Sequence, residues 1–173
     1  YIYDNKDEYL AVNNKLKIAK LNKELVASFS PSDETALSKL KSGIEDAIFI
    51  LDIEEGRETD YSVVMSKAEY DRQKETQLTD EGKSKIVSTL ATIDHKSMDD
   101  FKSDAKLQFY INLVNYNKNT SADNLLAVLK ESNSVLELDF TKLNRLSDAG
   151  KGKAAKQLAS KKSNSTATMQ TNL

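Results

Sequence analysis

Residues that interrupt helices are scarce along this chain. Its 173 residues include one proline, Pro31, and five glycines. Proline lacks a backbone N–H and glycine loses the most conformational freedom on ordering, so both residues weaken a helix that contains them. A chain with so few of them favours long helices joined by short polar turns, which is typical of an antiparallel helical bundle.

Apolar residues recur at intervals of three and four along most of the chain, as on the buried face of an amphipathic helix. One such stripe lies between Asp4 and Phe29, and a second follows Ser30 and Pro31, which together form a good helix start. Further helices are predicted at 58–78, 79–94, 97–116 and 121–146. We therefore predict an all-α bundle of four to six antiparallel helices, with most of the core contributed by the first and last long helices.

Several positions on these stripes are predicted to face the core, and Ser97 and Ser121 are predicted to cap helices. The acidic pairs Asp80–Glu81 and Asp99–Asp100 fall where helix N-termini favour negative charge. The predicted core positions are Leu40, Ile44, Leu129, Leu136 and Phe140.

A local alternative stays open for residues 48–65. The apolar run from Ile48 to Ile53 and the run from Tyr61 to Met65 flank a segment that contains Gly56. Two strands around a glycine-containing turn have this pattern, and the alternation of Leu136 with later apolar residues also has period two. The alternative to the bundle is therefore an α+β fold with a hairpin near 48–65.

The last 23 residues differ in composition from the rest. Residues 151–173 contain five lysines, no acidic residue and few large apolar side chains, although the whole chain has a net charge of −2. Such a segment buries too little apolar surface to offset its ordering entropy. We predict that helical order ends at 148–152, that residues 1–150 form the bundle domain, and that residues 151–173 are a basic, low-complexity tail, disordered unless bound to a partner.

The chain lacks the residues of several common active sites. It has no cysteine and one histidine, His95, which excludes thiol nucleophiles, disulfides and a zinc site of the usual Cys/His type. His95 falls in a predicted interhelical turn, where a solvent-exposed role is expected. The acidic pairs lack the spacing of a calcium-binding loop. We predict no catalytic residue, no metal site, no cofactor and no enzymatic activity.

By elimination, the sequence favours a non-catalytic structural or protein-interaction subunit of a larger assembly. A neighbouring protein surface with acidic residues would bind the lysines of the tail, and an oligomer fits this reading. The tail has no aromatic residue or arginine, which argues against sequence-specific nucleic-acid binding. The predicted partner-binding residues are Lys151, Lys153, Lys156, Lys161 and Lys162.

The alternative function is an extracytoplasmic ligand-sensing helical bundle of a membrane-tethered receptor. Tyr1 and Tyr3 are residues that favour a membrane–water interface, so this alternative includes a membrane tether upstream of Tyr1 and an extracytoplasmic location. The sequence favours a different interpretation of the two tyrosines, in which they pack on the first predicted helix, and it leaves the location open. The longest apolar run within the chain, Ala47–Leu51, is far too short to span a bilayer.

Overall fold

The computed structural model describes residues 36–69 and 72–173. Within these ranges helices are the only extended regular elements, and a single isolated bridge joins Leu78 to Asn117. The predicted all-α bundle is therefore confirmed. The first predicted helix, Asp4–Phe29, and the helix start at Ser30 lie outside the described residues.

The described part of the chain contains eight α-helices and one short 3₁₀-helix, rather than four to six helices. In chain order they are α3 (Ala36–Glu54), α4 (Tyr61–Lys67), the 3₁₀-helix η1 (Arg72–Gln77), α5 (Asp80–Leu90), α6 (Met98–Tyr116), α7 (Ala122–Leu136), α8 (Thr141–Asn144), α9 (Asp148–Lys161) and α10 (Thr166–Asn172).

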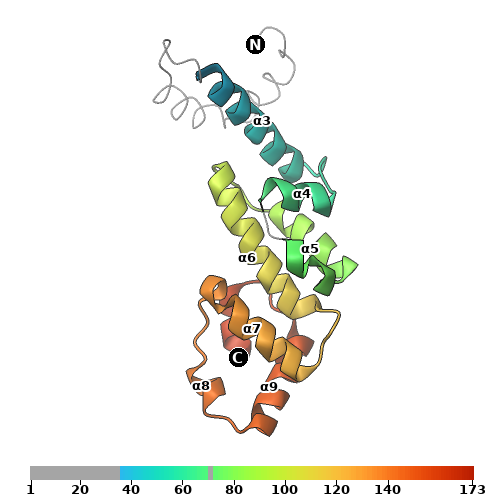
Figure 1. Ribbon diagram of the computed structural model, residues 1–173, viewed down its shortest axis with the longest axis vertical. Helices are drawn as coiled ribbons and strands as arrows, with labels where there is room; N and C mark the ends of the chain where they lie inside the picture. The colour runs from blue at the N-terminus through green and yellow to red at the C-terminus, as the bar shows by residue number, and fades with distance from the viewer. Residues whose placement is uncertain (1–35, 70–71) are drawn as a thin grey trace.

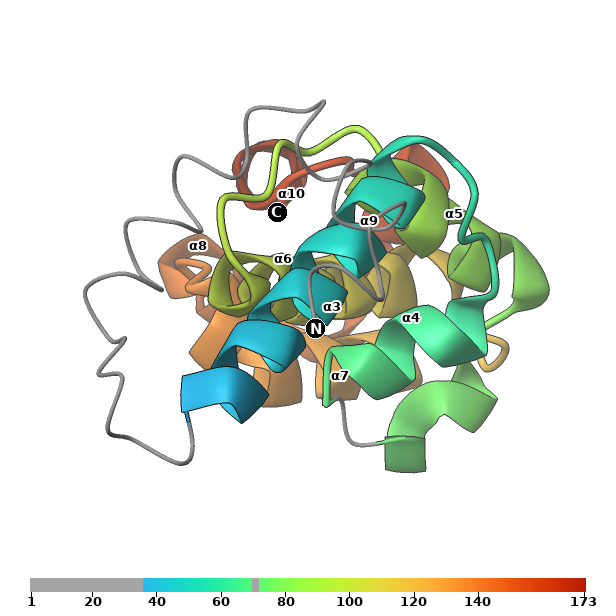
Figure 2. The ribbon, with the colours of Figure 1, turned by 90° about the horizontal axis from the view of Figure 1, so that it is seen from above.

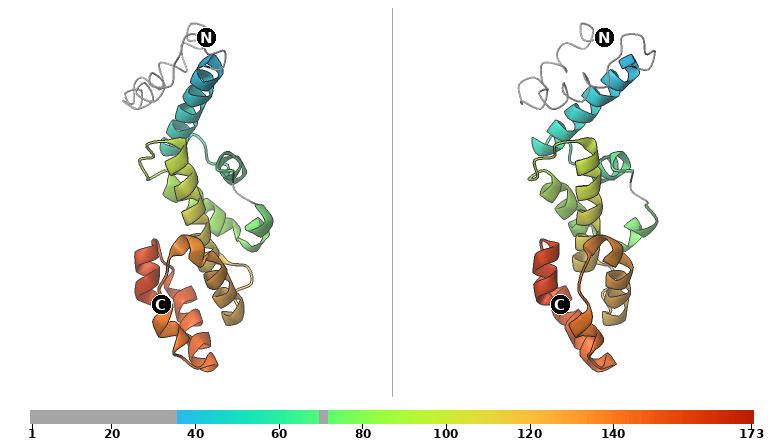
Figure 3. Two further views of the ribbon diagram at one scale, coloured as in Figure 1. Left: turned by 60° about the vertical axis from the view of Figure 1, so that its left-hand side comes forward. Right: turned by 90° about the vertical axis from the view of Figure 1, so that its left-hand side faces the viewer.

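The helices form an elongated body (Figures 1 and 3). α3 lies at one end, α5 and α6 occupy the middle, and α7 to α10 cluster at the other end. Viewed along the long axis, α3 and α4 lie nearest the viewer, and the rest of the bundle lies behind them (Figure 2). The middle helix α6 connects the two ends, because it packs against α3 and α5 on one side and against α7 and α9 on the other.

The core is centred on α6. Apolar residues on several sides of this helix, including Phe101, Phe109 and Ile111, are fully enclosed. In its second half, 108–115, this helix has no exposed position, which is typical of the interior of a bundle rather than of its surface. Among the described helices, α6 contributes the most side chains to the main core. The prediction that the first and last long helices supply most of the core stays a prediction, because the first of them, Asp4–Phe29, lies outside the described residues.

The predicted caps at Ser97 and Ser121 are confirmed. The Ser97 hydroxyl accepts a hydrogen bond from the Asp100 N–H (3.1 Å), and the Ser121 hydroxyl accepts one from the Asn124 N–H (3.2 Å). Each bond satisfies a backbone donor that the helix itself leaves unpaired. The pairs Asp80–Glu81 and Asp99–Asp100 lie in the first turns of α5 and α6, as predicted.

Most of the predicted core positions are confirmed. Ile44, Leu129 and Leu136 are buried. Phe140 is partly buried and packs against the main core. The side chain of Leu40 lies outside the described set.

The hairpin alternative at 48–65 is wrong. α3 continues to Glu54, and the chain reverses through Gly56, whose φ of 68° lies in the left-handed region that suits glycine. The Arg57 guanidinium pairs with the carboxylates of Asp52 (2.6 Å) and Glu55, so the turn is tied to the last turn of α3. α4 then begins after its N-cap, Asp60.

The last predicted helix is shorter than expected and does not run to residue 146. α7 ends at Leu136, and Glu137 adopts a left-handed conformation with φ 50° and ψ 41°. The side chain of Asn133 accepts a hydrogen bond from the Leu138 N–H (2.8 Å), so this side chain replaces the next helical carbonyl as the acceptor. The residues that alternate with period two, 136–140, are therefore those at which the helix ends.

Residues 148–172 are largely helical, so the prediction that helical order ends at 148–152 is wrong. α9 crosses the predicted domain boundary at residue 150, and α10 begins with a capping box between Ser165 and Thr168. Ala155, Leu158 and Met169 join the same core as α6 and α7. Composition alone misled because a segment with few apolar side chains can still fold when those few join a core that other helices supply.

Candidate functional site

The structure does not gather the five predicted partner-binding lysines into one patch. Lys153, Lys156 and Lys161 are exposed on α9. Lys151 projects from nearly the opposite side of α9 to Lys153, because successive residues of a helix differ by about 100°. The Lys151 ammonium lies 3.5 Å from the Asp148 carboxylate one turn earlier, so its charge is partly balanced within the helix.

Lys162 binds within the chain. Its ammonium lies 3.4 Å from Glu81 Oε1 on α5 and 3.8 Å from the centre of the Tyr116 ring on α6. The ion pair is solvent-exposed and contributes little by itself, whereas a cation so close to an aromatic face adds attraction. The acidic group that this lysine contacts in the structure thus belongs to the same chain.

His95 is buried, so its predicted exposure in a turn is wrong. Its ring packs edge-on against Phe101, with 5.4 Å between the ring centres. Nδ1 lies 3.9 Å from Glu54 Oε1 at the end of α3, and Nε2 lies 3.5 Å from Asp104 Oδ2 on α6. The backbone N–H of His95 also donates a hydrogen bond to Glu54 Oε1 (3.2 Å). The enclosed histidine therefore links α3 to α6, and its ring offers no accessible surface to a substrate.

The carboxyl group of Asp104 is electrostatically perturbed. Burial raises its pKa above the usual value, the neighbouring His95 opposes this shift, and Asp100 adds to it. Burial dominates because removing a carboxylate from water disfavours its charged form. The charged form of Asp104 is therefore less favoured in the folded chain than in the unfolded chain.

Asp104→Asn is expected to alter the pH dependence of stability. A folded-state pKa above the unfolded value, about 3.9, contributes stability at low pH that is lost as the pH rises through the folded pKa. The free energy of unfolding of the variant, relative to wild type, should therefore increase as the pH is raised from about 4. Urea denaturation at a series of pH values measures this difference. The exposed Asp123→Asn is the control, and an equally flat difference for both variants would contradict the prediction.

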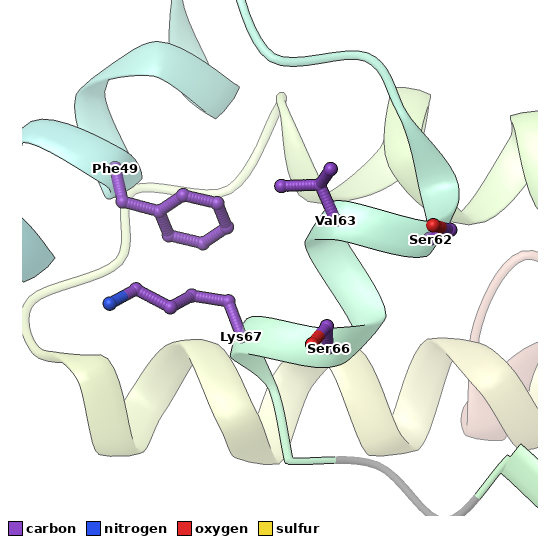
Figure 4. Close-up of a pocket in the computed structure, with 5 residues that line it drawn as sticks. All are labelled: Phe49, Ser62, Val63, Ser66 and Lys67. Carbon is purple, nitrogen blue, oxygen red and sulfur yellow. The ribbon is translucent and has the colours of Figure 1, made fainter.

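A groove of about 420 Å³ lies between α3 and α4. Figure 4 shows Phe49 from α3 facing Val63 from α4 across this groove. Ser62, Ser66 and Lys67, all from α4, complete the lining. The walls are thus apolar, and hydroxyl groups and one charged side chain lie along one side.

The local sequence explains why α4 presents this face. Tyr61, Val64 and Met65 turn inward to the core, which leaves the opposite side of this short helix toward the groove. Val63 is 43% exposed, which is unusual among the large apolar side chains of the described residues. A single exposed valine needs no explanation, but one that faces a phenylalanine across a groove forms part of an apolar surface.

The charge at the groove is locally balanced. The Lys67 ammonium lies 2.9 Å from Asp46 Oδ1 on α3 and 5.9 Å from the centre of the Phe49 ring. In Figure 4 the aliphatic part of Lys67 runs beneath that ring. The ion pair holds the side chain along the groove, so an occupant meets mainly aliphatic and aromatic surface.

Sequence reasoning missed the groove residues as a site. Phe49 appeared only within an apolar run, and Val63 only within the hairpin alternative. The available signal was that Val63 lies off the helical stripe formed by Tyr61, Val64, Met65 and Ala68. The exposed position of Val63 indicates a site only once the structure shows that the turn at 55–60 brings α4 beside α3.

Comparison of the chain with protein-family models, with curated proteins and with solved structures finds no match. Among the described residues no cluster of three or more acidic or histidine side chains is arranged to hold a metal ion. In the same part of the chain, no helix has the length and apolar content that a bilayer span requires.

Proposed function

We propose that this chain is a non-catalytic protein-interaction module that binds a partner through the groove between α3 and α4. The observation that carries the proposal is the apolar pair Phe49 and Val63, which face each other across an open groove of about 420 Å³. Clefts lined by apolar and aromatic side chains with a few polar groups are the usual form of binding sites.

The lining indicates the kind of partner. Phe49 and Val63 fit an apolar side chain, and Ser66 offers a hydroxyl for a backbone or side-chain polar group beside it. The Lys67–Asp46 pair balances its own charge, so shape and apolar contact select the partner more than net charge does. A protein segment that inserts one apolar anchor residue meets these requirements.

The proposal is tested by selecting peptides from a random library against the whole chain, with the variant Val63→Lys as counter-selection. We expect peptides that share an apolar anchor, and at least a tenfold weaker affinity for Val63→Lys, because an inserted apolar side chain contributes roughly 1.5 to 3 kcal/mol. Leu146→Lys, at an equally exposed position on another part of the bundle, is the control. The proposal fails if no peptide is selected or if selected peptides bind both variants with the affinity of wild type.

The lysines of residues 151–173 stay a predicted second contact. Lys153, Lys156 and Lys161 are exposed on α9, which belongs to the group of helices at the other end of the molecule from α3 (Figure 1). An acidic partner surface would contact them in a salt-sensitive manner, because exposed charges are screened over about 10 Å at 0.1 M salt. A partner that used both regions would therefore extend along the molecule.

A ligand-sensing bundle is the second candidate function. The observation that favours it is a cavity between α5, α6 and the α9–α10 link, which has amide and lysine side chains in its lining and is separate from the α3–α4 groove. Membrane tethering and an extracytoplasmic location stay predictions from the sequence.

A further inference from the structure

A second cavity, of about 90 Å³, lies where α5, α6 and the link between α9 and α10 meet. Its lining differs from that of the α3–α4 groove, since it is rich in amide side chains. Gln108, Asn112 and Asn115 of α6 contribute to it, together with Lys85 of α5 and Ser163 of the link. Such a volume holds several water molecules or one small organic molecule.

The three amides share one face of α6 because they are spaced by four and three residues. All three are more than nine-tenths buried, and Asn112 is 2% exposed. Burying an amide is costly unless its hydrogen-bonding groups are paired. Three buried amides on one helix face therefore require an account of what each of them binds.

Asn115 is accounted for by the fold. Its Nδ2 donates to the Ser163 carbonyl (2.6 Å), and its Oδ1 accepts from the Ser163 N–H (3.0 Å). These two bonds hold the link against α6. Lys162, the residue before Ser163, has a φ of 36°, which is unfavourable for a lysine. The link is thus fixed in a conformation that also forms one wall of the cavity.

Gln108 and Asn112 are only partly accounted for. Asn112 Nδ2 donates to the Gln108 carbonyl (2.8 Å) and approaches Gln108 Oε1 (3.5 Å). Among the described residues no hydrogen bond is found to Asn112 Oδ1 or Gln108 Nε2, and neither atom is one of the fully buried polar atoms that lack a partner, so both stay accessible to water or a ligand. One acceptor and one donor therefore remain on side chains that line the cavity.

The charge around the cavity is positive. Lys85 and Lys162 both line it; Lys85 forms no ion pair with any described residue, whereas Lys162 is paired with Glu81 at 3.4 Å. A cation beside a set of buried amides favours an anionic ligand that also carries hydrogen-bonding groups. A carboxylate meets both requirements in a small volume.

We propose that this cavity binds a small organic carboxylate of the size of an amino acid or a short hydroxy acid. Lys85 pairs with the carboxylate, and the amino or hydroxyl group of the ligand bonds the amides of Gln108 and Asn112. The proposal is independent of the α3–α4 groove.

The test titrates the ¹⁵N-labelled whole chain with glycine, alanine, glycolate, lactate and succinate, and follows the side-chain amide resonances of Gln108 and Asn112. Sodium chloride and inorganic phosphate at matched ionic strength are the anion controls. At least one carboxylate should give saturable shifts of these resonances. Lys85→Gln should weaken that binding at least tenfold, as expected when a charged hydrogen bond is lost. Lys153→Gln makes the same charge change on α9 and should leave the affinity unchanged.

Asn112→Leu replaces the amide with an apolar side chain of similar shape and should also weaken binding at least tenfold, as followed at the Gln108 resonance. If Asn112→Leu does not fold, Lys85→Gln still tests the proposal. The proposal is overturned if none of the five carboxylates shifts these resonances, because the cavity then holds only water. It is also overturned if phosphate or chloride produces the same shifts, or if Lys85→Gln and Lys153→Gln bind the ligand equally well.

Discussion

Truncation of the chain after Gly150 is expected to lower the free energy of unfolding by about 3 to 6 kcal/mol, because burial of Leu158 and Met169 contributes roughly 1.5 to 3 kcal/mol for each side chain. Both side chains are fully enclosed in the core shared with α6 and α7. The truncation also removes Ser163, the partner of the buried Asn115 amide. Urea denaturation followed by circular dichroism measures the loss.

The control for this truncation is the double variant Lys153→Gln, Lys156→Gln, which reduces the positive charge of the segment without touching its buried face. It should unfold within about 0.5 kcal/mol of wild type, as surface substitutions usually do. An unfolding midpoint of the truncated chain equal to that of wild type would show that residues 151–173 do not belong to the folded core. The sequence-based prediction of a detachable tail would then stand.

Leu136→Ala is expected to lower the free energy of unfolding by about 2 to 5 kcal/mol, from the lost transfer free energy and the cavity left behind. Leu136 is 2% exposed, at the end of α7. Its neighbour Glu137 reverses the chain there, which limits how far the site can collapse around a smaller side chain. Chemical denaturation of the purified variant measures the change.

Leu146→Ala is the matched control, since it removes the same atoms from a leucine that is 42% exposed. Its effect should stay below about 1 kcal/mol, as expected of a surface position. Equal losses at the two positions would contradict the burial that distinguishes them. No loss at either position would show that α7 does not pack as described.

Local signals in the sequence were sufficient for much of the helical architecture. Ser97 and Ser121, the two predicted caps, accept the hydrogen bonds that start α6 and α7. Capping of this kind depends on residues within three positions of one another, so it can be recognised without tertiary structure. The same holds for the stripe of Tyr61, Val64 and Met65, which is buried on α4 as its spacing predicts.

Predictions failed where contacts other than the regular apolar spacing along a helix decided the outcome. His95 is enclosed by Glu54 and Asp104, which lie on two other elements, and nothing adjacent to it in the sequence indicates burial. The end of α7 at Leu136 depends on the side chain of Asn133 and on the packing of Leu138 and Phe140 against the core. The burial of His95 has no periodic signature, and the period-two alternation at 136–140 was assigned to a strand alternative rather than to the end of a helix.

The candidate sites were beyond sequence reasoning for the same reason. The groove exists because the turn after Glu54 sets Val63 opposite Phe49, and the cavity exists because Ser163 closes over one face of α6. Gln108, Asn112 and Asn115 could be seen as one helical face in the sequence. Their burial could not be predicted, because the segment that covers them, 151–173, was predicted to be disordered.

The sequence by itself determined the helical class, through its lack of helix-breaking residues, its three- and four-residue spacing of apolar side chains and its capping residues. Those are properties of one helix at a time, set by contacts within a few residues. Only the tertiary structure decided that α6 is the central helix and that residues 151–173 belong to the core. The physical reason is that burial depends on the surface a segment covers as well as on its own composition, and α9 and α10 are held by apolar and amide groups that other helices supply.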